Sequence, residues 1–537
     1  MTHIDYKRRQ FLQYAALGTL ATTLPGFALA ESRGLNQTPN NLFKADVEIA
    51  LTAQTADIPI LPGAHTHVFK YHGKLLKGPQ TALKELPGYL GPILNFEQGQ
   101  KVRIYFYNQL PEPCVTHWHG MHVPQVMDGH PMYAIYRGEQ YVYEFEVKNP
   151  TGTNWYHSHT HELTATQVYQ GLAGLITISD EAERKLDLPS GEFDIPLVIQ
   201  DRSFTNGNQL RYILNRHQRM RGFLGDTILV NGQEISAIPV KTRAYRMRIL
   251  NGSNSRIYKL GWEDGTPMIA IGTDGGLLEK PETLPYIMLA PAERVELWVD
   301  FSGRKPGSDL MLQNLAYQGS ASHRGGGMGG GMHQDMGRMD MMDGASAQNE
   351  VISIAKFHII EQISDSPKLP VELVPMRRLT TQDISNPDKT VPIAIGMRHM
   401  AFQLNGKTFD MQGHTELEKI PVNSVQKIKI YHDNRGMGGG MRGGRGGMGM
   451  MMAMPHPIHL HGQQFQILSR TQINQGNVYD TIKDGFINSG WKDTALVMPG
   501  EEIEIIKPFK DFTGLFLYHC HNLEHEDMGM MRNFFVS

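Results

Sequence analysis

Hydrophobic and polar residues alternate with a period of two in short segments that recur along the whole chain. Clear examples are residues 102–106, 141–147, 295–299 and 502–505. Because successive side chains of a β-strand point to opposite faces, this alternation predicts strands with one buried face. Glycine, proline and asparagine separate the segments, which predicts many short antiparallel connections. Sustained helical periodicity is hard to find, so the pattern predicts an all-β chain built from sandwiches.

Two pairs of short motifs repeat near the two ends of the chain, in the same order. Residues 116–120 (THWHG) resemble 458–462 (IHLHG), and residues 155–159 (WYHSH) resemble 517–521 (LYHCH). A duplicated domain at each end is the simplest explanation. The segment between them, roughly 190–370, has strand-like segments of its own but no paired histidines. It is therefore predicted to be a spacer domain.

Length and charge limit the possible functions. The chain has 537 residues, with 51 Lys and Arg against 54 Asp and Glu, a formal net charge of −3. This length is typical of about three domains. A slightly acidic chain without a clustered cationic face gives no electrostatic basis for nucleic-acid binding. Only 2 cysteines are present, so at most one disulfide could form and stability must come from the hydrophobic core.

The first residues are typical of a secretory signal. Lys7, Arg8 and Arg9 precede an uncharged stretch, 11–30, that ends in small residues suited to cleavage after Ala30. The run KRRQFL resembles a twin-arginine signal, whose export machinery carries folded proteins. An ordinary Sec signal or an N-terminal anchor is the alternative. No other stretch approaches the ~18 apolar residues of a membrane span. We expect residues 1–30 to be a signal peptide and the remaining chain to be soluble, monomeric and periplasmic.

Ten of the 24 histidines fall in four short clusters, and Cys520 lies inside the last cluster. The clusters are His117 and His119; His157 and His159; His456, His459 and His461; His519, His521 and His525. Along a strand, His519 and His521 point to one side while Cys520 points to the other. By the same parity His459 and His461 can share a face, which leaves His456 free to turn toward Cys520. This assigns Cys520, His456 and His525 to one metal and the other eight histidines to a second cluster.

The ligand types indicate copper. Two imidazoles and a thiolate with a weak axial thioether form a blue-copper electron-transfer centre. Met530 is the natural axial ligand, and Met528 and Met531 are nearby alternatives. Zinc would require further cysteine or histidine ligands. Eight imidazoles without carboxylates suit copper better than magnesium, calcium or a carboxylate di-iron site.

These four motifs resemble those of the multicopper oxidase (laccase-like) superfamily, and the resemblance covers essentially the whole mature chain. It implies three cupredoxin-like Greek-key β-sandwich domains, which we place at 40–185, 190–370 and 385–537. It also implies a type 1 copper in the third domain and a trinuclear copper cluster between the first and third domains. Four copper ions are therefore expected.

The resemblance implies a ligand set by position. His117 and His459 would bind the type 2 copper; His119, His157 and His521 one type 3 copper; and His159, His461 and His519 the other. Every expected ligand position is filled, unlike in the copper-free relatives of this superfamily. Cys114 lies outside the pattern and is expected to be an unpaired thiol.

The same resemblance implies the reaction. Four one-electron oxidations at the type 1 copper would send electrons through Cys520 and its flanking histidines to the trinuclear cluster, where dioxygen becomes two waters. Asp128 and Glu526 occupy positions of proton relays, consistent with the tuning of acids near a site that accumulates charge. The alternatives are that Asp128 belongs to an Asp-Gly turn and that Glu526 is a surface charge.

Two glycine- and methionine-rich tracts, 324–344 and 436–454, hold thirteen methionines and are predicted insertions. Thioether sulfur prefers Cu(I), so the tracts resemble those of bacterial cuprous oxidases, the copper-efflux-oxidase branch. The candidate substrate ligands are Met452, Met454, Met336 and Asp335. Arg442 and Arg445 argue against Cu(I) binding by the middle of the second tract.

Three other interpretations stay open at this point. The tracts could be flexible insertions without function, because methionine is a common adaptable filler. A laccase-type oxidase of phenols or diamines would use the same coppers with an open pocket near His525. A non-enzymatic copper-sequestering protein would use only the methionines, but the complete set of cluster histidines argues against it.

Overall fold

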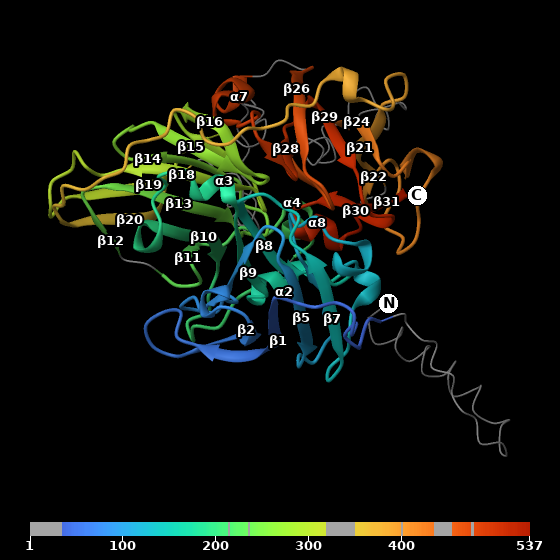
Figure 1. Ribbon diagram of the computed structural model, residues 1–537, viewed down its shortest axis with the longest axis horizontal. Helices are drawn as coiled ribbons and strands as arrows, with labels where there is room; N and C mark the ends of the chain where they lie inside the picture. The colour runs from blue at the N-terminus through green and yellow to red at the C-terminus, as the bar shows by residue number, and fades with distance from the viewer. Residues whose placement is uncertain are drawn as a thin grey trace, which may run out of the picture. The chain divides into compact units, whose positions relative to one another are not determined.

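The computed structural model describes residues 35–212, 215–234, 237–317, 350–398, 401–433, 454–473 and 477–537. Strands dominate this part of the chain and form six sheets (Figure 1). The predicted all-β class is confirmed. The predicted signal peptide and most of the two methionine-rich tracts lie outside the described residues.

The N-terminal sandwich pairs a four-stranded sheet, β2-β1-β5-β7, with a five-stranded sheet, β3-β4-β9-β8-β6. Val68 of the first sheet shares a buried cluster with Trp155 and Leu175 of the second. The strands are β1 (Val47–Ile58), β2 (Thr66–Lys77), β3 (Leu83–Lys84), β4 (Ile93–Glu97), β5 (Lys101–Asn108), β6 (Thr116–His117), β7 (Gln140–Glu146), β8 (Gly152–Ser158) and β9 (Ala173–Ser179).

The second sandwich pairs a six-stranded sheet, β11-β10-β13-β18-β15-β16, with a five-stranded sheet, β12-β20-β19-β14-β17. Ile249 and Leu297 of the first sheet pack with Leu260 and Phe357 of the second. The strands are β10 (Asp194–Arg202), β11 (Thr227–Val230), β12 (Ile238–Lys241), β13 (Ala244–Asn251), β14 (Tyr258–Trp262), β15 (Met268–Thr273), β16 (Gly276–Leu284), β17 (Ile287–Leu289), β18 (Arg294–Asp300), β19 (Asp309–Asn314) and β20 (Ile352–Glu361).

The third sandwich pairs a six-stranded sheet, β22-β21-β24-β29-β26-β27, with a five-stranded sheet, β23-β31-β30-β25-β28. Ile430 and Ile505 of the first sheet pack with Ile458 and Phe534 of the second. The strands are β21 (Val391–Arg398), β22 (Ala401–Leu404), β23 (Lys419–Ile420), β24 (Ser424–His432), β25 (His456–Leu460), β26 (Phe465–Gln472), β27 (Trp491–Lys492), β28 (Thr494–Val497), β29 (Glu501–Phe509), β30 (Gly514–Cys520) and β31 (Met531–Val536).

The helices of the described residues are short and connect the strands. They are α2 (Thr164–Gln170), α3 (Glu181–Arg184), α4 (Arg216–Arg221), α7 (Asn477–Asp480) and α8 (Leu523–Asp527), with 3-10 turns η1 (Gln80–Ala82), η2 (Gln125–Met127), η3 (Pro131–Tyr133), η4 (Gly191–Phe193), η5 (Thr381–Asp383), η6 (Glu416–Glu418) and η8 (Lys483–Gly485). Among the described helices, none has the length and apolar character needed to span a bilayer.

Parallel strand pairs occur in every sandwich, which corrects part of the sequence-based expectation. β1 pairs parallel with β5, β10 with β13, and β21 with β24. The expectation of short antiparallel connections is therefore incomplete, because parallel neighbours require a long crossover. Hydrophobic alternation indicates which face of a strand is buried. It does not indicate whether the neighbouring strand in the sheet runs parallel or antiparallel.

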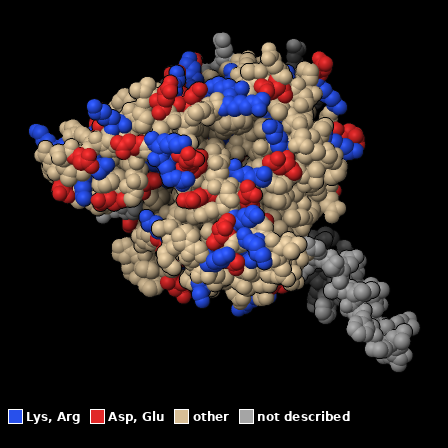
Figure 2. Space-filling view, viewed as in Figure 1, with Lys and Arg blue, Asp and Glu red and all other residues tan. Residues whose placement is uncertain are grey.

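Charged side chains of both signs are interspersed on the face shown in Figure 2. Lys and Arg lie next to Asp and Glu over most of that face, so it shows no extended single-sign area. Such a surface agrees with the near balance of charges in the sequence, where 51 cations oppose 54 anions.

A buried ion pair joins the second and third sandwiches. Arg294, at the start of β18, donates from Nη1 to Asp493 Oδ1 at 2.8 Å and from Nη2 to Oδ2 at 2.6 Å. Its Nε donates to the carbonyl oxygen of Thr153, in β8 of the first sandwich, at 3.0 Å. Both side chains of the ion pair are 0% exposed. One guanidinium therefore contacts all three sandwiches.

Replacing Arg294 by Gln is expected to lower the free energy of unfolding by about 3–5 kcal/mol, because Asp493 would keep a buried charge without its partner. The matched control is Arg304→Gln, which breaks the partly exposed pair of Arg304 with Asp264 in the same sandwich. That variant is expected to lose less than about 1 kcal/mol. Urea unfolding followed by circular dichroism measures both, and equal losses would contradict the prediction.

Candidate metal centres

Two strand pairs in different sandwiches bring the predicted ligands together. In the first sandwich β6 pairs with β8, so that His117 lies opposite His157. In the third sandwich β25 pairs with β30, so that His459 lies opposite His519. Opposed residues of an antiparallel pair share one face of the sheet. Each pairing thus presents imidazoles from two strands on the same side.

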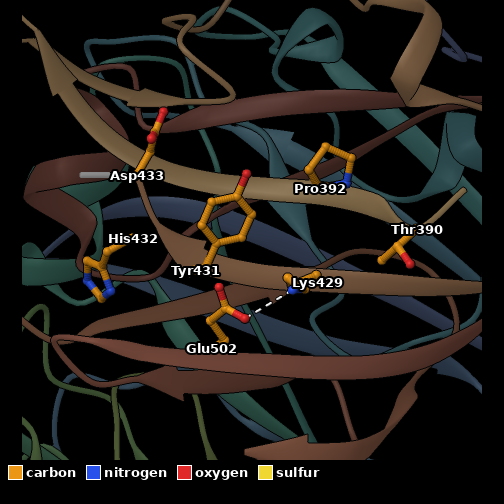
Figure 3. A pocket seen from close by; sticks show the side chains of 7 residues that line it. All are labelled: Thr390, Pro392, Lys429, Tyr431, His432, Asp433 and Glu502. Atoms are coloured by element: carbon orange, nitrogen blue, oxygen red, sulfur yellow. Dashed lines mark hydrogen bonds and ion pairs between the residues drawn. The ribbon is translucent and has the colours of Figure 1, made fainter. Parts of the chain in front are cut away.

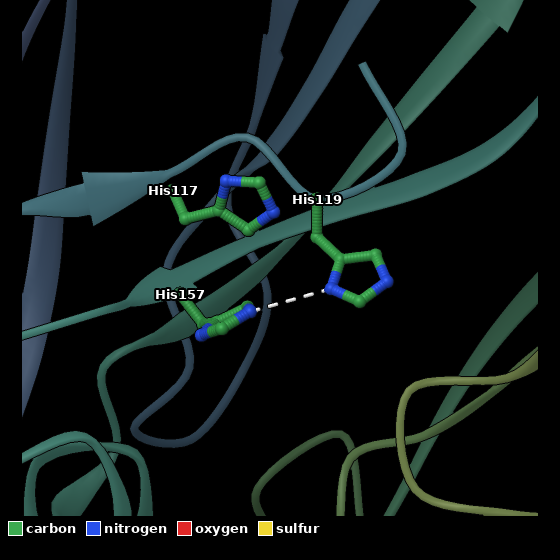
Figure 4. Close-up of side chains that lie close together, drawn as sticks. All are labelled: His117, His119 and His157. Atoms are coloured by element: carbon green, nitrogen blue, oxygen red, sulfur yellow. Dashed lines mark hydrogen bonds between the residues drawn. The ribbon is translucent and has the colours of Figure 1, made fainter. Parts of the chain in front are cut away.

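The eight histidines predicted for the second cluster form one buried group, and none is more than 2% exposed. Three of their rings are drawn in Figure 4, where His119 and His157 point toward each other. Nitrogen atoms of neighbouring rings lie close enough together to bind the same metal ion. The distances are 3.4 Å between His119 Nδ1 and His157 Nε2, 3.3 Å between His159 Nε2 and His519 Nε2, and 3.2 Å between His461 Nε2 and His519 Nε2.

Backbone carbonyl groups fix the orientation of four of these rings. A carbonyl oxygen only accepts, so the Nδ1 atom that it binds must carry the hydrogen, which leaves the Nε2 lone pair for a metal. In each case Nδ1 donates to a backbone carbonyl oxygen: His117 to that of Asp128 at 2.5 Å, His157 to that of Ser158 at 2.8 Å, His459 to that of Asp493 at 2.9 Å and His519 to that of Cys520 at 3.1 Å.

Several ring nitrogens of this group have no hydrogen-bond partner among the described residues. They are Nε2 of His117 and His459, Nδ1 of His159 and both ring nitrogens of His521. A buried polar atom without a partner costs about 1–3 kcal/mol, so these atoms need a ligand. Burial lowers the pKa of His157 to about 3 and that of His117 below its usual range, which keeps the rings neutral. Neutral imidazoles at this density fit copper ions.

Asp128 lies beside two of the imidazoles. Its Oδ2 accepts from His461 Nδ1 at 2.7 Å, and its Oδ1 lies 3.5 Å from His117 Nδ1. Asp128 is 2% exposed, and burial raises its pKa well above the usual range. Asp128 also follows η2 in a turn, so the same residue belongs to a turn and contacts the cluster.

Glu526 is buried against the same cluster and is not a surface charge. Its Oε2 lies 3.1 Å from His519 Nδ1, and its Oε1 lies 3.6 Å from His159 Nε2. It is 2% exposed, and both of its oxygens are without a hydrogen-bond partner among the described residues. Glu526 thus presents a buried carboxyl group to two imidazoles of the cluster.

A third carboxylate at this cluster, Asp493, was missed by the sequence analysis. Its Oδ1 accepts from His119 Nε2 at 3.1 Å, which turns His119 Nδ1 toward the other rings. Although burial acts to raise it, the Arg294 guanidinium and His119 hold the pKa of Asp493 well below its usual range. The signal in the sequence was the polar run Lys492–Asp493–Thr494 directly before the apolar residues 495–498.

The second predicted centre contains Cys520, His456 and His525. Cys520 lies opposite Ile458 and thus on the side of the strand away from His519. Its Sγ lies 3.5 Å from His456 Nδ1 and 3.8 Å from His525 Nδ1. All three side chains are buried, and their ligand atoms lie within 4.8 Å of one another. The predicted alternation of Cys520 with its flanking histidines is present in the structure.

The backbone favours Met530 as the neighbour of Cys520. The amide of Cys520 donates to the Met530 carbonyl at 3.0 Å, and both side chains belong to one buried cluster. Met531 lies opposite His519 and shares the face that points away from Cys520. Met528 is only partly buried against that cluster. Met530 therefore fits the axial position better than the two alternatives.

Contacts from the other two sandwiches hold α8, which carries His525 and Glu526. Glu524 Oε1 accepts from Tyr212 Oη at 2.6 Å, and Glu524 Oε2 accepts from the Phe223 amide at 3.1 Å. Asp527 accepts from the amides of Thr164 and Ala165, at 3.0 and 2.9 Å. The ligands on α8 are thus positioned by residues far away in the sequence.

The imidazole of His525 is closed off from solvent. Its Nε2 donates to the carbonyl of Met220, in α4, at 3.1 Å, and its ring lies 4.0 Å from that of Phe402. His525 is 0% exposed. Short helix α4 therefore covers this edge of His525.

The predicted substrate residues are only partly described. Met336, Asp335 and Met452 lie outside the described residues. Met454 is half-buried, and its carbonyl accepts from His432 Nε2 at 3.2 Å. The sequence analysis did not single out His432, which lies against His456 with ring centroids 5.5 Å apart. Cys114, expected to be unpaired, is a buried free thiol.

Comparisons with known proteins agree with this architecture. Family profiles described as multicopper oxidase match residues 76–183 and 382–537. A laccase of Bacillus stratosphericus is 30% identical over 503 residues, which cover 84% of this chain and 90% of the laccase. The crystal structure of the McoA multicopper oxidase from Aquifex aeolicus matches with a TM-score of 0.73 and 30% identity, covering 92% of this chain and 97% of that one. A Campylobacter jejuni multicopper oxidase described as a metallo-oxidase matches with a TM-score of 0.70 and 25% identity, covering 94% of each chain.

The three sandwiches are accordingly cupredoxin-like, as the sequence resemblance implied. Copper is the metal that the family uses, and the clustered imidazoles with the cysteine fit it. The chain belongs to the multicopper oxidase family, the copper-dependent oxidoreductases that use dioxygen as electron acceptor.

Proposed function

We propose that this protein is a cuprous oxidase, which oxidises Cu(I) to Cu(II), reduces dioxygen to water and contributes to copper tolerance in the periplasm. Four bound copper ions would supply the one-electron redox chemistry that joins the two half-reactions. The methionine-rich tracts and the signal-like residues 1–30 support the substrate and the compartment. The Campylobacter jejuni relative, described as a metallo-oxidase, also supports a metal substrate.

The observation that carries this proposal is the closed edge of His525. An organic donor transfers its electron best when its ring contacts a ligand of the electron-accepting copper. Here the Met220 carbonyl and the Phe402 ring cover His525, which has no exposed surface. A single metal ion needs far less room than a phenol, so a closed site favours Cu(I) over an aromatic substrate.

The residues proposed to hold the type 1 copper are Cys520, His456 and His525, with Met530 as the axial ligand. The ligand atoms of the first three lie within 4.8 Å of one another, and Met530 belongs to the same buried cluster as Cys520. Two imidazoles, a thiolate and a weak thioether are the ligand types of a blue-copper centre. Cys520 also connects this centre to the cluster, because the carbonyl of the same residue accepts from His519 Nδ1 at 3.1 Å.

For the cluster we propose the assignment by position. His117 and His459 hold the type 2 copper, and the two type 3 coppers are held by His119, His157 and His521 and by His159, His461 and His519. Close approach of the last three ligand atoms supports their grouping. The position of His521 supports the grouping of His119, His157 and His521. Its ring centroid lies 5.1 Å from that of His119 and 5.3 Å from that of His157.

Asp128 and Glu526 are proposed to supply the protons that dioxygen reduction consumes. Each carboxyl group is buried and has an oxygen close to a ring nitrogen of the cluster. The distances are 2.7 Å for Asp128 and 3.1 Å for Glu526. Burial of Asp128 favours its protonated form, so Oδ1, which lacks a hydrogen-bond partner among the described residues, can carry a proton. Asp493 is unsuited to this role because Arg294 keeps it ionised. Its carboxylate instead orients His119.

The alternative is a laccase-type oxidase of phenols or diamines, which the similarity to the Bacillus stratosphericus laccase supports. It would require α4 to leave His525. A copper-sequestering protein without catalysis would not need buried carboxyl groups beside the cluster, so Asp128 and Glu526 argue against that function.

Steady-state comparison of Cu(I) and a phenol as electron donors tests the proposal. We expect kcat/KM for Cu(I) to exceed that for the phenol by at least about tenfold, a difference of roughly 1.4 kcal/mol. Replacing residues 215–221 by two glycines should raise kcat/KM for the phenol about tenfold, because His525 would be uncovered. The control Arg219→Ala changes an exposed side chain of α4 and keeps the cover. A wild-type preference for the phenol would refute the proposal.

Replacing Asp128 by Asn tests the proton relay. The amide can still accept from His461 Nδ1 but cannot exchange a proton, so kcat should fall roughly 10²-fold while the copper content stays at the wild-type value. Oxygen uptake and metal analysis measure the two quantities. Asp264→Asn, at the surface of the second sandwich, is the control and should keep its turnover. Wild-type turnover in fully loaded Asp128→Asn would remove Asp128 from the relay.

A further inference from the structure

Glu524, in α8, is a buried carboxylate whose two oxygen atoms each accept two hydrogen bonds. Oε1 accepts from Tyr212 Oη at 2.6 Å and from Asn254 Nδ2 at 2.9 Å. Oε2 accepts from the Phe223 amide at 3.1 Å and from the hydroxyl of Ser255. A carboxylate offers about four lone pairs, and the four donors occupy them. The group therefore has no place for a proton and carries a negative charge.

No ion pair balances the charge of Glu524. All four donors are neutral groups, and among the described residues no lysine or arginine forms an ion pair with this carboxylate. Glu526, two residues later, differs, because neither of its oxygens has a hydrogen-bond partner in the part of the chain that the structure describes. A carboxylate held by dipoles alone acts on its surroundings as a full charge, because no opposite charge cancels it.

The surroundings of Glu524 are closely packed and exclude solvent. Glu524 is 2% exposed, and His525, the next residue, is 0% exposed. Gly222 follows α4 with φ +88°, and a Cβ atom at this position would collide with Ser255 Oγ and with Asn522 Nδ2. Charges interact more strongly where water is excluded, because the local dielectric constant is low.

Two connections link Glu524 to the ligands proposed for the type 1 copper. Glu524 directly precedes His525 in α8. Ser255 Oγ, which contacts Glu524, also lies 3.1 Å from Asn522 Oδ1, and the amide of Asn522 donates to Cys520 Sγ at 3.4 Å. The carboxylate is thus fixed to the backbone that carries two of the ligands.

We propose that the Glu524 carboxylate sets the reduction potential of the type 1 copper by stabilising its more positive state. The ligand set holds one more positive charge with Cu(II) than with Cu(I), so a buried anion beside it favours Cu(II) and lowers the potential. The four donors that fix Glu524 belong to connections of the second sandwich, between β10 and β11 and between β13 and β14.

The second sandwich thereby determines how readily the type 1 copper accepts an electron, although it supplies none of the proposed ligands. The proposal rests on the type 1 ligands Cys520, His456, His525 and Met530 proposed above. It is independent of the substrate that donates the electron.

Redox titration of the fully copper-loaded protein, followed by the visible absorption of the type 1 copper, tests this role. Glu524→Gln removes the charge and keeps the size of the side chain, so the equilibrium between Cu(II) and Cu(I) should shift at least tenfold toward Cu(I). For a one-electron couple, tenfold is a rise of the midpoint potential by about 59 mV. Glu524→Asp keeps the charge and should keep this equilibrium within about twofold of wild type. Equal midpoint potentials for the two variants would overturn the proposal.

Tyr212 allows a second test that leaves Glu524 unchanged. A lysine side chain has about the reach of tyrosine, so Tyr212→Lys places an ammonium group where Oη donates to Glu524. It should raise the midpoint potential, as Glu524→Gln does, because the cation partly cancels the charge. Tyr212→Phe removes only a hydrogen bond and should shift the equilibrium less than about twofold. If Glu524→Gln does not retain copper, equal midpoint potentials for the Lys and Phe variants would refute the role of the charge.

Glu502→Gln is the control for loss of a carboxylate from the third sandwich. Figure 3 shows Glu502 beside Lys429 on the wall of a cavity of about 490 Å³, and the two side chains pair at 3.0 Å. Their exposed fractions are 29% and 35%, so solvent and the lysine screen the charge. This variant should keep the wild-type midpoint potential, and a shift equal to that of Glu524→Gln would contradict a specific role of Glu524.

Failure of the copper assignment gives a different result. A copper-loaded wild type without type 1 absorption would overturn the proposed ligands and the role of Glu524 together. Normal absorption with the same midpoint potential in wild type and Glu524→Gln would overturn the role of Glu524 alone.

Discussion

The antiparallel pairing of β25 with β30 is the constraint on which both metal centres depend. His459 lies opposite His519 and Ile458 lies opposite Cys520, so one strand pair offers imidazoles on one face and a thiolate on the other. A shift of the register by one residue would exchange the two faces and destroy both sites at once. The apolar cluster around Ile458 and Cys520 keeps this register, because the same shift would also move buried side chains out of the core.

Burial of many neutral imidazoles is costly, and the protein compensates through the outer atoms of the rings. Carbonyl groups hold the Nδ1 atoms of His117, His157, His459 and His519, so the inner nitrogens are fixed before a metal arrives. The Asp493 carboxylate fixes the His119 ring in a similar way, but it binds Nε2 and leaves Nδ1 for the metal. The Arg294 guanidinium in turn binds Asp493. The second sandwich, although predicted to be only a spacer, thus contributes to the geometry of a cluster to which it gives no proposed ligand.

Local sequence patterns predicted the strands, the histidine groups and the opposite orientation of Cys520, because each depends on the period of a single strand. They did not predict the parallel pairing of β1 with β5, the role of Asp493 or the cover that α4 places over His525. These features arise from contacts between residues far apart in the sequence. His432 was missed for the same reason, since only the folded chain brings it to His456.

The separation of the ligands along the chain has a consequence for the order of events during biosynthesis. The histidines at 117–159 are made well before the histidines at 456–525. Domains fold in order from the N-terminus during synthesis, so the first sandwich exists while its four imidazoles still lack their partners. The cluster of eight histidines can therefore be completed only after the third sandwich has been made and has packed against the first.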